Sequence, residues 1–144
     1  MHKKLWLSLP LCFLVGTASA EAPPGRYTDK TRETIFDKRT QLTWQLILSN
    51  EALSWGGANT YCGSLALAGG GWRLPNRSEL LTLVDPAESI PAIDATAFPN
   101  TPSEWFWSST VHASGSTHAW AVNFGLGDSD GWSRDKTYRV RCVR

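Results

Sequence analysis

Histidine is scarce in this chain of 144 residues, which contains three. Only His112 and His118 lie beyond the first twenty residues. Two histidines are too few for a three-histidine iron site, and no Ser-His-Asp arrangement can be assigned from the sequence. We therefore predict that the protein is not an enzyme and has no catalytic residues, no metal site and no cofactor.

An excess of charge of either sign is also lacking. The 14 basic and 13 acidic residues leave a formal net charge of +1. Without the first twenty residues, which contain two lysines and no acid, the balance is 12 basic against 13 acidic residues. Such a balance argues against a nucleic-acid partner and against a polybasic membrane anchor.

No hydrophobic run is long enough to cross a bilayer. The longest apolar stretch, residues 5–15, has eleven residues and is interrupted by Pro10, whereas a spanning helix needs about twenty. Two lysines precede this stretch, and the small residues Ala18-Ser19-Ala20 follow it. This pattern predicts a signal peptide over residues 1–20, removed on export to the periplasm or the extracellular space, and no membrane anchor.

A lipoprotein signal is the alternative interpretation of the N-terminus, because Cys12 lies within the apolar stretch. The bulky Leu11 stands where a small residue should precede a lipidated cysteine, and the apolar run continues past Cys12. These two features favour the cleaved signal peptide.

Cysteine is as scarce as histidine, and removal of the signal would leave Cys62 and Cys142. An even pair in an oxidising compartment predicts a disulfide, while a reactive or metal-binding thiol pair is the competing interpretation. A disulfide here would close a loop of about 80 residues, for which chain entropy gives about 4–5 kcal/mol of stabilisation.

The first half of the mature chain predicts a hairpin and two helices. Residues 21–32 form an N-terminal lead whose first six residues are predicted to be disordered. Extended pieces within residues 27–44 predict the hairpin, with its turn at 37–40. Ser54 is the predicted N-cap of the first helix, whose apolar face would consist of Trp55, Ala58, Cys62 and Leu65. Asn76 and Glu79 predict a capping box for the second helix, with Leu80, Leu81 and Val84 on its buried side.

The second half predicts a long loop followed by strands. Four prolines within residues 85–102 disfavour regular structure there. Residues 106–110, 119–124 and 138–143 are predicted strands, and residues 125–131 a turn-rich connection. In the middle strand we expect Trp120, Val122 and Phe124 on the buried side and Ala121 and Asn123 opposite. Two helices followed by antiparallel strands indicate an α+β domain.

Motifs spread through residues 33–144 resemble the bacterial Lcl C-terminal domain family. They include Gly70-Gly71-Trp72-Arg73-Leu74-Pro75, Trp107-Ser108-Ser109, Ala119-Trp120-Ala121-Val122-Asn123-Phe124 and Val140-Arg141-Cys142-Val143-Arg144. The resemblance implies a C-type-lectin-like fold, with two helices, a small twisted antiparallel sheet and a disulfide from the first helix to the last strand. Phage-type variable receptor proteins share that fold and display ligand-binding residues on late strands and loops. Formylglycine-generating enzymes share it too.

Tryptophans are the main candidates for a binding surface. Trp44, Trp55, Trp72, Trp107 and Trp120 stand in periodic or motif positions and are predicted to pack in the core. Trp132 lies in a polar stretch, where it is either a lid on the core or a stacking platform for a sugar ring. Trp105 would share a strand side with Trp107, and its role stays open.

Basic residues gather in the last eleven positions. Arg139 and Arg141 would share the outer side of the final strand, next to Arg134 and Lys136. They form either a solvated face or an anion-binding stripe for sulfated or carboxylated glycans. Asp128 and Asp130 resemble part of a calcium loop, but the remaining ligands are missing, so a tight polar turn is favoured.

These features predict a secreted or periplasmic recognition module that binds a carbohydrate, such as an anionic polysaccharide, or another surface polymer through its late strands and loops, in the manner of an adhesin. The alternatives are a structural component that docks an envelope protein partner and an unrecognised enzyme of the formylglycine-generating-like fold. The expected ligand-binding residues are Trp132, Asn123, Arg134, Lys136, Arg139, Arg141 and Trp105.

Overall fold

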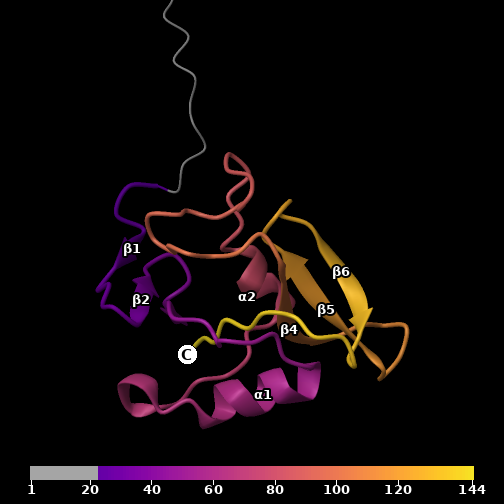
Figure 1. Cartoon of the computed structure of the whole chain (residues 1–144). Coiled ribbons are helices and arrows are strands. Elements are labelled where there is room, and N and C mark those ends of the chain that lie inside the picture. Colours follow the sequence, from indigo (N-terminus) through magenta and orange to yellow (C-terminus); the bar gives the residue numbers. More distant parts are fainter. Residues whose placement is uncertain (1–22) are drawn as a thin grey trace, which may run out of the picture.

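Two antiparallel sheets and two helices form the part of the chain described by this computed structural model, residues 23–144 (Figure 1). The predicted signal peptide and the alternative lipidation at Cys12 lie outside these residues. The first sheet consists of β1 (Tyr27–Thr28), β2 (Thr34–Asp37) and β3 (Leu42–Gln45). The second consists of β4 (Trp105–Val111), β5 (His118–Asn123) and β6 (Ser129–Ser133). The helices are α1 (Trp55–Ser64) and α2 (Arg77–Leu81), with a short 3-10 turn, η1 (Leu67–Gly69), between them. The predicted α+β class is confirmed.

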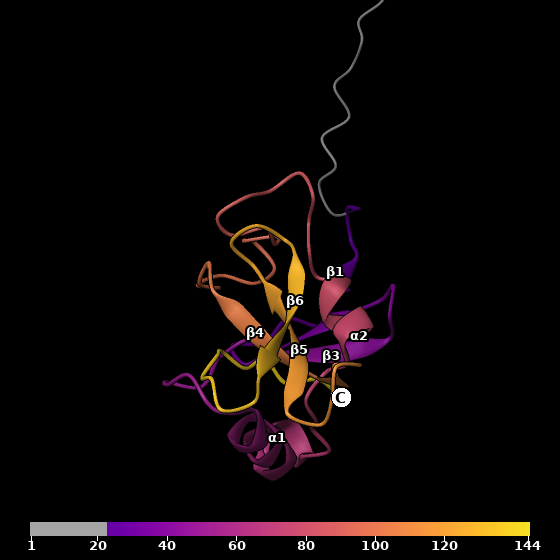
Figure 2. The ribbon, with the colours of Figure 1, turned by 90° about the vertical axis from the view of Figure 1, so that its right-hand side faces the viewer.

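Helix α1 begins where the sequence predicts and lies at one end of the molecule, below both sheets in Figures 1 and 2. The Ser54 hydroxyl accepts a hydrogen bond from the Gly57 N–H at 3.2 Å, which satisfies one of the free amides of the first turn. Ala58 and Cys62 are fully buried, as expected. The backbone is extended at Leu65, so its inclusion in the helical face was wrong.

Helix α2 has the predicted capping box. The Asn76 side chain accepts from the Glu79 N–H at 2.8 Å, and the Glu79 carboxylate accepts from the Asn76 N–H at 2.9 Å. The same carboxylate forms a two-point ion pair with Arg73, which ties the extended segment before the helix to its first turn. Helix α2 packs against β4 and β5.

The first hydrophobic cluster fills the space between the first sheet, α2 and one face of the second sheet. Leu80 is buried there, as predicted, but Leu81 and Val84 are only half-buried, and Leu83 takes the second buried position. Leu83 lies in the turn that follows α2, where the helical period no longer applies. The prediction continued the helical period to Val84, and it therefore placed Val84 on the buried side in place of Leu83.

The N-terminal lead is part of the folded unit from Arg26 onward. β1 pairs with β2, and the Arg26 guanidinium donates to the Asp37 carboxylate at 2.7 and 3.0 Å and to the Thr82 carbonyl at 2.9 Å. The predicted disorder is therefore wrong for Arg26. Burial raises the pKa of the Asp37 carboxyl, but hydrogen bonds from Arg26, the Arg39 N–H and Thr40 outweigh it, and the pKa is lower than usual.

The second sheet is buried on both faces, which the predicted one-sided alternation did not anticipate. Val122 and Phe124 pack into the first cluster. Ala119 and Ala121, on the opposite face of β5, are also fully buried, in a second cluster around α1 and the disulfide. Trp120, predicted to be core, is half-buried beneath the Arg77 guanidinium, 3.8 Å from the ring centre.

The disulfide between Cys62 and Cys142 is confirmed, with the two Cα atoms 5.5 Å apart. It joins α1 to the C-terminal segment, which crosses between α1 and the sheets (Figure 1). The predicted strand over residues 138–143 is wrong, because this segment makes only isolated bridges, to Leu53, Trp44, Arg73 and Phe106. Each bridge pairs only one short stretch of backbone. The segment therefore contacts several elements but belongs to neither sheet.

The long connection from α2 to β4 contains no regular helix or strand, as its prolines predict. One bridge, between Val84 and Ile93, pairs the beginning of this connection with its middle. None of the helices within residues 23–144 is both long and apolar enough to cross a membrane.

Candidate functional site

Three half-buried aromatic side chains form a cluster on the α1-side face of the second sheet, which we call the aromatic patch: Trp105, Trp132 and Tyr138. The Trp105 and Trp132 ring centres are 5.4 Å apart, and their planes meet at 70°. Tyr138 lies 6.2 Å from Trp105 and 6.0 Å from Trp132. The patch therefore brings together the two tryptophans that the sequence suggested for ligand binding.

The strand register explains why these rings meet. Residues that pair directly across an antiparallel sheet point to the same face. Trp105 pairs with Asn123, and Trp132 pairs with Ala119. Because alanine has a small side chain, the central strand leaves space above it for the rings of both neighbouring strands. The sequence signal for this arrangement is the pair of alanines, Ala119 and Ala121, between two tryptophan-bearing strands.

Tyr138 is the member of the patch that the sequence reasoning missed, because it was assigned to the buried side of a final strand. Its ring centre lies 4.8 Å from that of the buried Trp107, with the two planes tilted by 53°, and its backbone exchanges two hydrogen bonds with Leu53. Burial raises the pKa of its hydroxyl, and the negative charge of Asp130 raises it further. The Tyr138 hydroxyl therefore stays neutral and available as a donor at physiological pH.

Trp132 is neither a fully buried lid nor a free platform. Its ring is half-buried and packs on the edge of the second cluster. Its indole N–H is buried and has no hydrogen-bond partner among the described residues. One edge of the ring therefore belongs to the core, and only the remainder is available to a ligand.

Two polar residues lie on the same sheet face as the patch. Asn123 uses its side-chain oxygen to accept from the Gly125 N–H at 2.8 Å, which shapes the turn and leaves its amide nitrogen as a donor. Asp130 pairs with Ala121, and one of its carboxylate oxygens accepts from the Gly131 N–H at 2.7 Å. Because Asp130 is exposed, its second oxygen remains an acceptor at the surface.

Arg134 lies at the α1 end of the patch. Its guanidinium is 3.9 Å from the centre of the Trp55 ring, and this cation–π contact holds it against the start of α1. Trp55, predicted to be core, is half-buried, and its indole N–H donates to the Ser108 carbonyl at 2.9 Å. Arg134 therefore adds a fixed positive charge beside the aromatic rings.

The basic stripe predicted on the final segment does not exist as one surface. Arg141 was expected on the outer side but is 1% exposed, and it donates to the Gln45 carbonyl at 2.6 Å and the Thr101 hydroxyl at 2.8 Å. Arg139 pairs with the Glu104 carboxylate at 2.9 Å, and Lys136 is exposed in the turn after β6. The expectation for Arg141 was wrong because an irregular segment does not alternate its side chains.

Asp128 and Asp130 belong to different elements. Asp128 precedes β6 and Asp130 lies within it, so the predicted turn ends earlier than expected. Across residues 23–144 no group of three or more histidine, cysteine, aspartate or glutamate side chains is placed to hold a metal ion. His112 hydrogen-bonds to the Ser114 hydroxyl at 2.7 Å in the turn after β4, and His118 to the Thr117 hydroxyl at 3.0 Å at the start of β5.

The family model of the Lcl C-terminal domain matches residues 33–144, which include α1, α2, the second sheet and both disulfide cysteines. A search of curated proteins found no significant match.

Proposed function

The chain belongs to the Lcl C-terminal domain family, and we propose that it is a non-enzymatic recognition module that binds carbohydrate at the aromatic patch. The supporting observation is the position of Trp105, Trp132 and Tyr138, half-exposed on one sheet face with free polar groups beside them. An aromatic ring next to oriented donors and acceptors suits a sugar, whose C–H faces are apolar and whose rim carries hydroxyls.

The polar neighbours would orient such a sugar. The Asn123 amide and the Tyr138 hydroxyl supply donors, and the second oxygen of Asp130 supplies an acceptor. Arg134 is held by Trp55 beside the rings, so its position is fixed before a ligand arrives. A preorganised group loses little conformational entropy on binding.

The distribution of positive charge favours a neutral or weakly charged sugar over a polyanion at this site. Arg141 is buried and Arg139 is neutralised by Glu104, which leaves Arg134 and Lys136 as the cations beside the patch. Asp130 offsets part of that charge. We therefore expect sugar affinity to depend weakly on salt.

We also propose that the protein acts outside the cytoplasm and that it has a C-type-lectin-like fold. A buried disulfide that closes a loop of 80 residues persists in an oxidising compartment, and the N-terminal sequence fits a signal peptide. The bridge from α1 to the last segment, the two helices and the small antiparallel sheets are the features that support the fold assignment.

A glycan array tests the proposed function with two matched variants. Trp105→Ala removes a ring of the patch, and Trp120→Ala removes a ring of similar burial in the same sheet, next to Arg77 and outside the patch. We expect Trp105→Ala to weaken binding to the recognised sugar about tenfold or more, since a stacking ring contributes about 0.5–1.5 kcal/mol beyond its buried area. Trp120→Ala should keep the wild-type affinity.

Both variants should lose a similar amount of stability, so a folding defect cannot produce the expected difference. Equal weakening by the two substitutions would contradict the assignment of the site. Binding that falls steeply between 50 mM and 500 mM salt would contradict a neutral sugar. If the array shows no ligand and the patch captures an envelope protein, the docking alternative replaces this proposal.

A further inference from the structure

A second surface hollow, outside the aromatic patch, has the size of a small-molecule site. This groove has a volume of about 640 Å³ and is lined by the β1–β2 connection, the segment after β3 and the long loop before β4. Sites for small ligands have volumes of about 300–1,000 Å³ and combine apolar walls with a few polar groups. None of its lining residues belongs to the patch.

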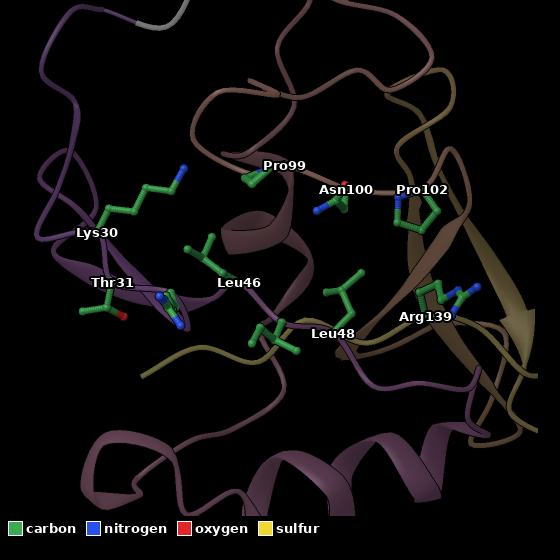
Figure 3. A pocket seen from close by; sticks show the side chains of 10 residues that line it. Lys30, Thr31, Leu46, Leu48, Pro99, Asn100, Pro102 and Arg139 are labelled. Carbon is green, nitrogen blue, oxygen red and sulfur yellow. The ribbon is translucent and has the colours of Figure 1, made fainter.

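One wall of the groove is apolar. Leu46, Ile47 and Leu48 line it. Two prolines of the long loop, Pro99 and Pro102, stand opposite Leu46 and Leu48 (Figure 3). Leu46 is buried in the first cluster. Ile47 is 57% exposed, and it is one of the four large hydrophobic side chains that are exposed within residues 23–144. A ligand with an apolar chain would cover this surface.

Basic side chains stand at both ends of the groove, and the one at the Arg139 end is paired with Glu104. Figure 3 shows Lys30 and Arg139 at opposite ends, with Leu46 and Leu48 between them. Arg32 also lines the groove and is exposed, and no lining residue is acidic. Lys30 donates to the Thr96 carbonyl at 2.6 Å, which holds its ammonium in place without neutralising it. Glu104, from outside the lining, offsets Arg139 alone.

A fourth positive charge lies behind the groove wall. The Arg141 guanidinium is bonded to Gln45, which precedes Leu46, and to Thr101, which lies between two lining residues. It also lies 4.9 Å from the Phe98 ring centre. No carboxylate pairs with Arg141 in the described chain, and its Nε has no partner. Burial lowers its pKa to about 9, so it remains charged at neutral pH. A buried cation without a counter-ion favours a negative charge in the adjacent groove.

We propose that the groove binds an amphipathic anion: an unbranched acyl chain that ends in a carboxylate. The acyl chain would lie along Leu46, Ile47 and Leu48. Its carboxylate would bind Lys30 or Arg32, at the end of the groove opposite Arg139. A free fatty acid and a carboxylate-terminated lipid tail share this chemistry. The proposal does not rest on carbohydrate binding at the patch.

Titration of the ¹⁵N-labelled protein with decanoate, below its micelle concentration, tests the proposal. Amide shifts should concentrate in residues 30–32, 46–48 and 100, with a dissociation constant that is at least tenfold lower than for butyrate or for 1-decanol. Equal affinity for 1-decanol overturns the anionic part of the proposal, and equal affinity for butyrate overturns the apolar part. Shifts confined to the aromatic patch, or spread over the molecule, overturn the site. A vesicle containing a carboxylate-terminated lipid, added in place of decanoate, distinguishes the membrane source from the free acid.

Exposed residues allow matched variants that should fold. Ile47→Ser should weaken decanoate binding about tenfold, while Leu126→Ser, which changes a side chain 75% exposed and outside the groove, should not. Arg32→Glu should weaken decanoate binding by at least as much as Ile47→Ser does, and Arg32→Lys should keep the wild-type affinity. Arg39→Glu is the charge control, because Arg39 is also exposed but lies outside the groove. Equal effects of a groove variant and its control refute the proposal.

Discussion

Replacing Gly131 by alanine tests how β6, the strand that carries Trp132 and Asp130, is held in place. A Cβ atom at Gly131 would overlap Cδ2 of the His112 ring and lie 2.7 Å from its Cγ. The backbone at Gly131 is not in the left-handed region, so alanine would meet no conformational strain there. The imidazole of His112 is therefore the obstacle to this substitution.

The structure sets the size of the expected effect. To admit the methyl group, His112 must leave its position 4.7 Å from the Trp120 ring and its 2.7 Å hydrogen bond to Ser114. An aromatic pair contributes about 0.5–1.5 kcal/mol and a hydrogen bond a similar amount. We therefore expect Gly131→Ala to lower the free energy of unfolding by about 1–3 kcal/mol, the range of overpacked sites.

In a His112→Ala background, Gly131→Ala should instead raise the free energy of unfolding. With the ring absent, the methyl group has space, and alanine in a strand is favoured over glycine by about 0.5–1 kcal/mol. The double-mutant cycle should therefore give a coupling energy of about 2 kcal/mol. Urea denaturation of the four proteins, followed by tryptophan fluorescence, measures it. Effects that add to within about 0.5 kcal/mol would show that His112 does not occupy this space.

Two further predictions concern the ion pair of Asp37 and the disulfide. The contribution of Asp37 to stability is fully present well above its ordinary pKa of 3.8 and is lost as the pH falls below that value, because its folded pKa is lower. Acid titration of the unfolding free energy should show this loss, and a profile unchanged in Asp37→Asn would contradict the ion pair with Arg26. Replacing Cys62 and Cys142 together by alanine should lower the unfolding free energy by about 4–5 kcal/mol, from the 80-residue separation of the cysteines. A loss below about 2 kcal/mol in urea denaturation would indicate a denatured state that is already compact.

Local signals predicted the helices well. The Ser54 cap and the capping box of Asn76 and Glu79 are each formed by residues three positions apart, so the sequence contains both partners. The cysteine pairing was predictable for a different reason: if Cys12 is removed with the expected signal peptide, the two remaining cysteines can pair in only one way.

Strand predictions succeeded for β4 and β5 and failed for β6, most of which was predicted as a turn, and for residues 138–143, which form no strand. β5 lies close to its expected bounds, but alternation assumes one buried face, and here each face of the sheet meets a separate core cluster. Trp120 is only half-buried, whereas Ala121 on the other face lies in the core. The candidate site was found in part: Trp105 and Trp132 do meet, whereas Tyr138 was missed, because its partners are more than 30 positions away or across a bend.

The sequence by itself determined the helix caps of this protein and its family, because these depend on neighbouring residues or on matches position by position. It predicted the Cys62–Cys142 pairing on the expectation that Cys12 is removed. Only the tertiary structure decided what each charged residue does. Arg134 covers Trp55, Arg139 pairs with Glu104, and Arg141 is buried without a counter-ion. Each role depends on contacts with segments from 35 to nearly 100 positions away, and no local pattern records which segments those are.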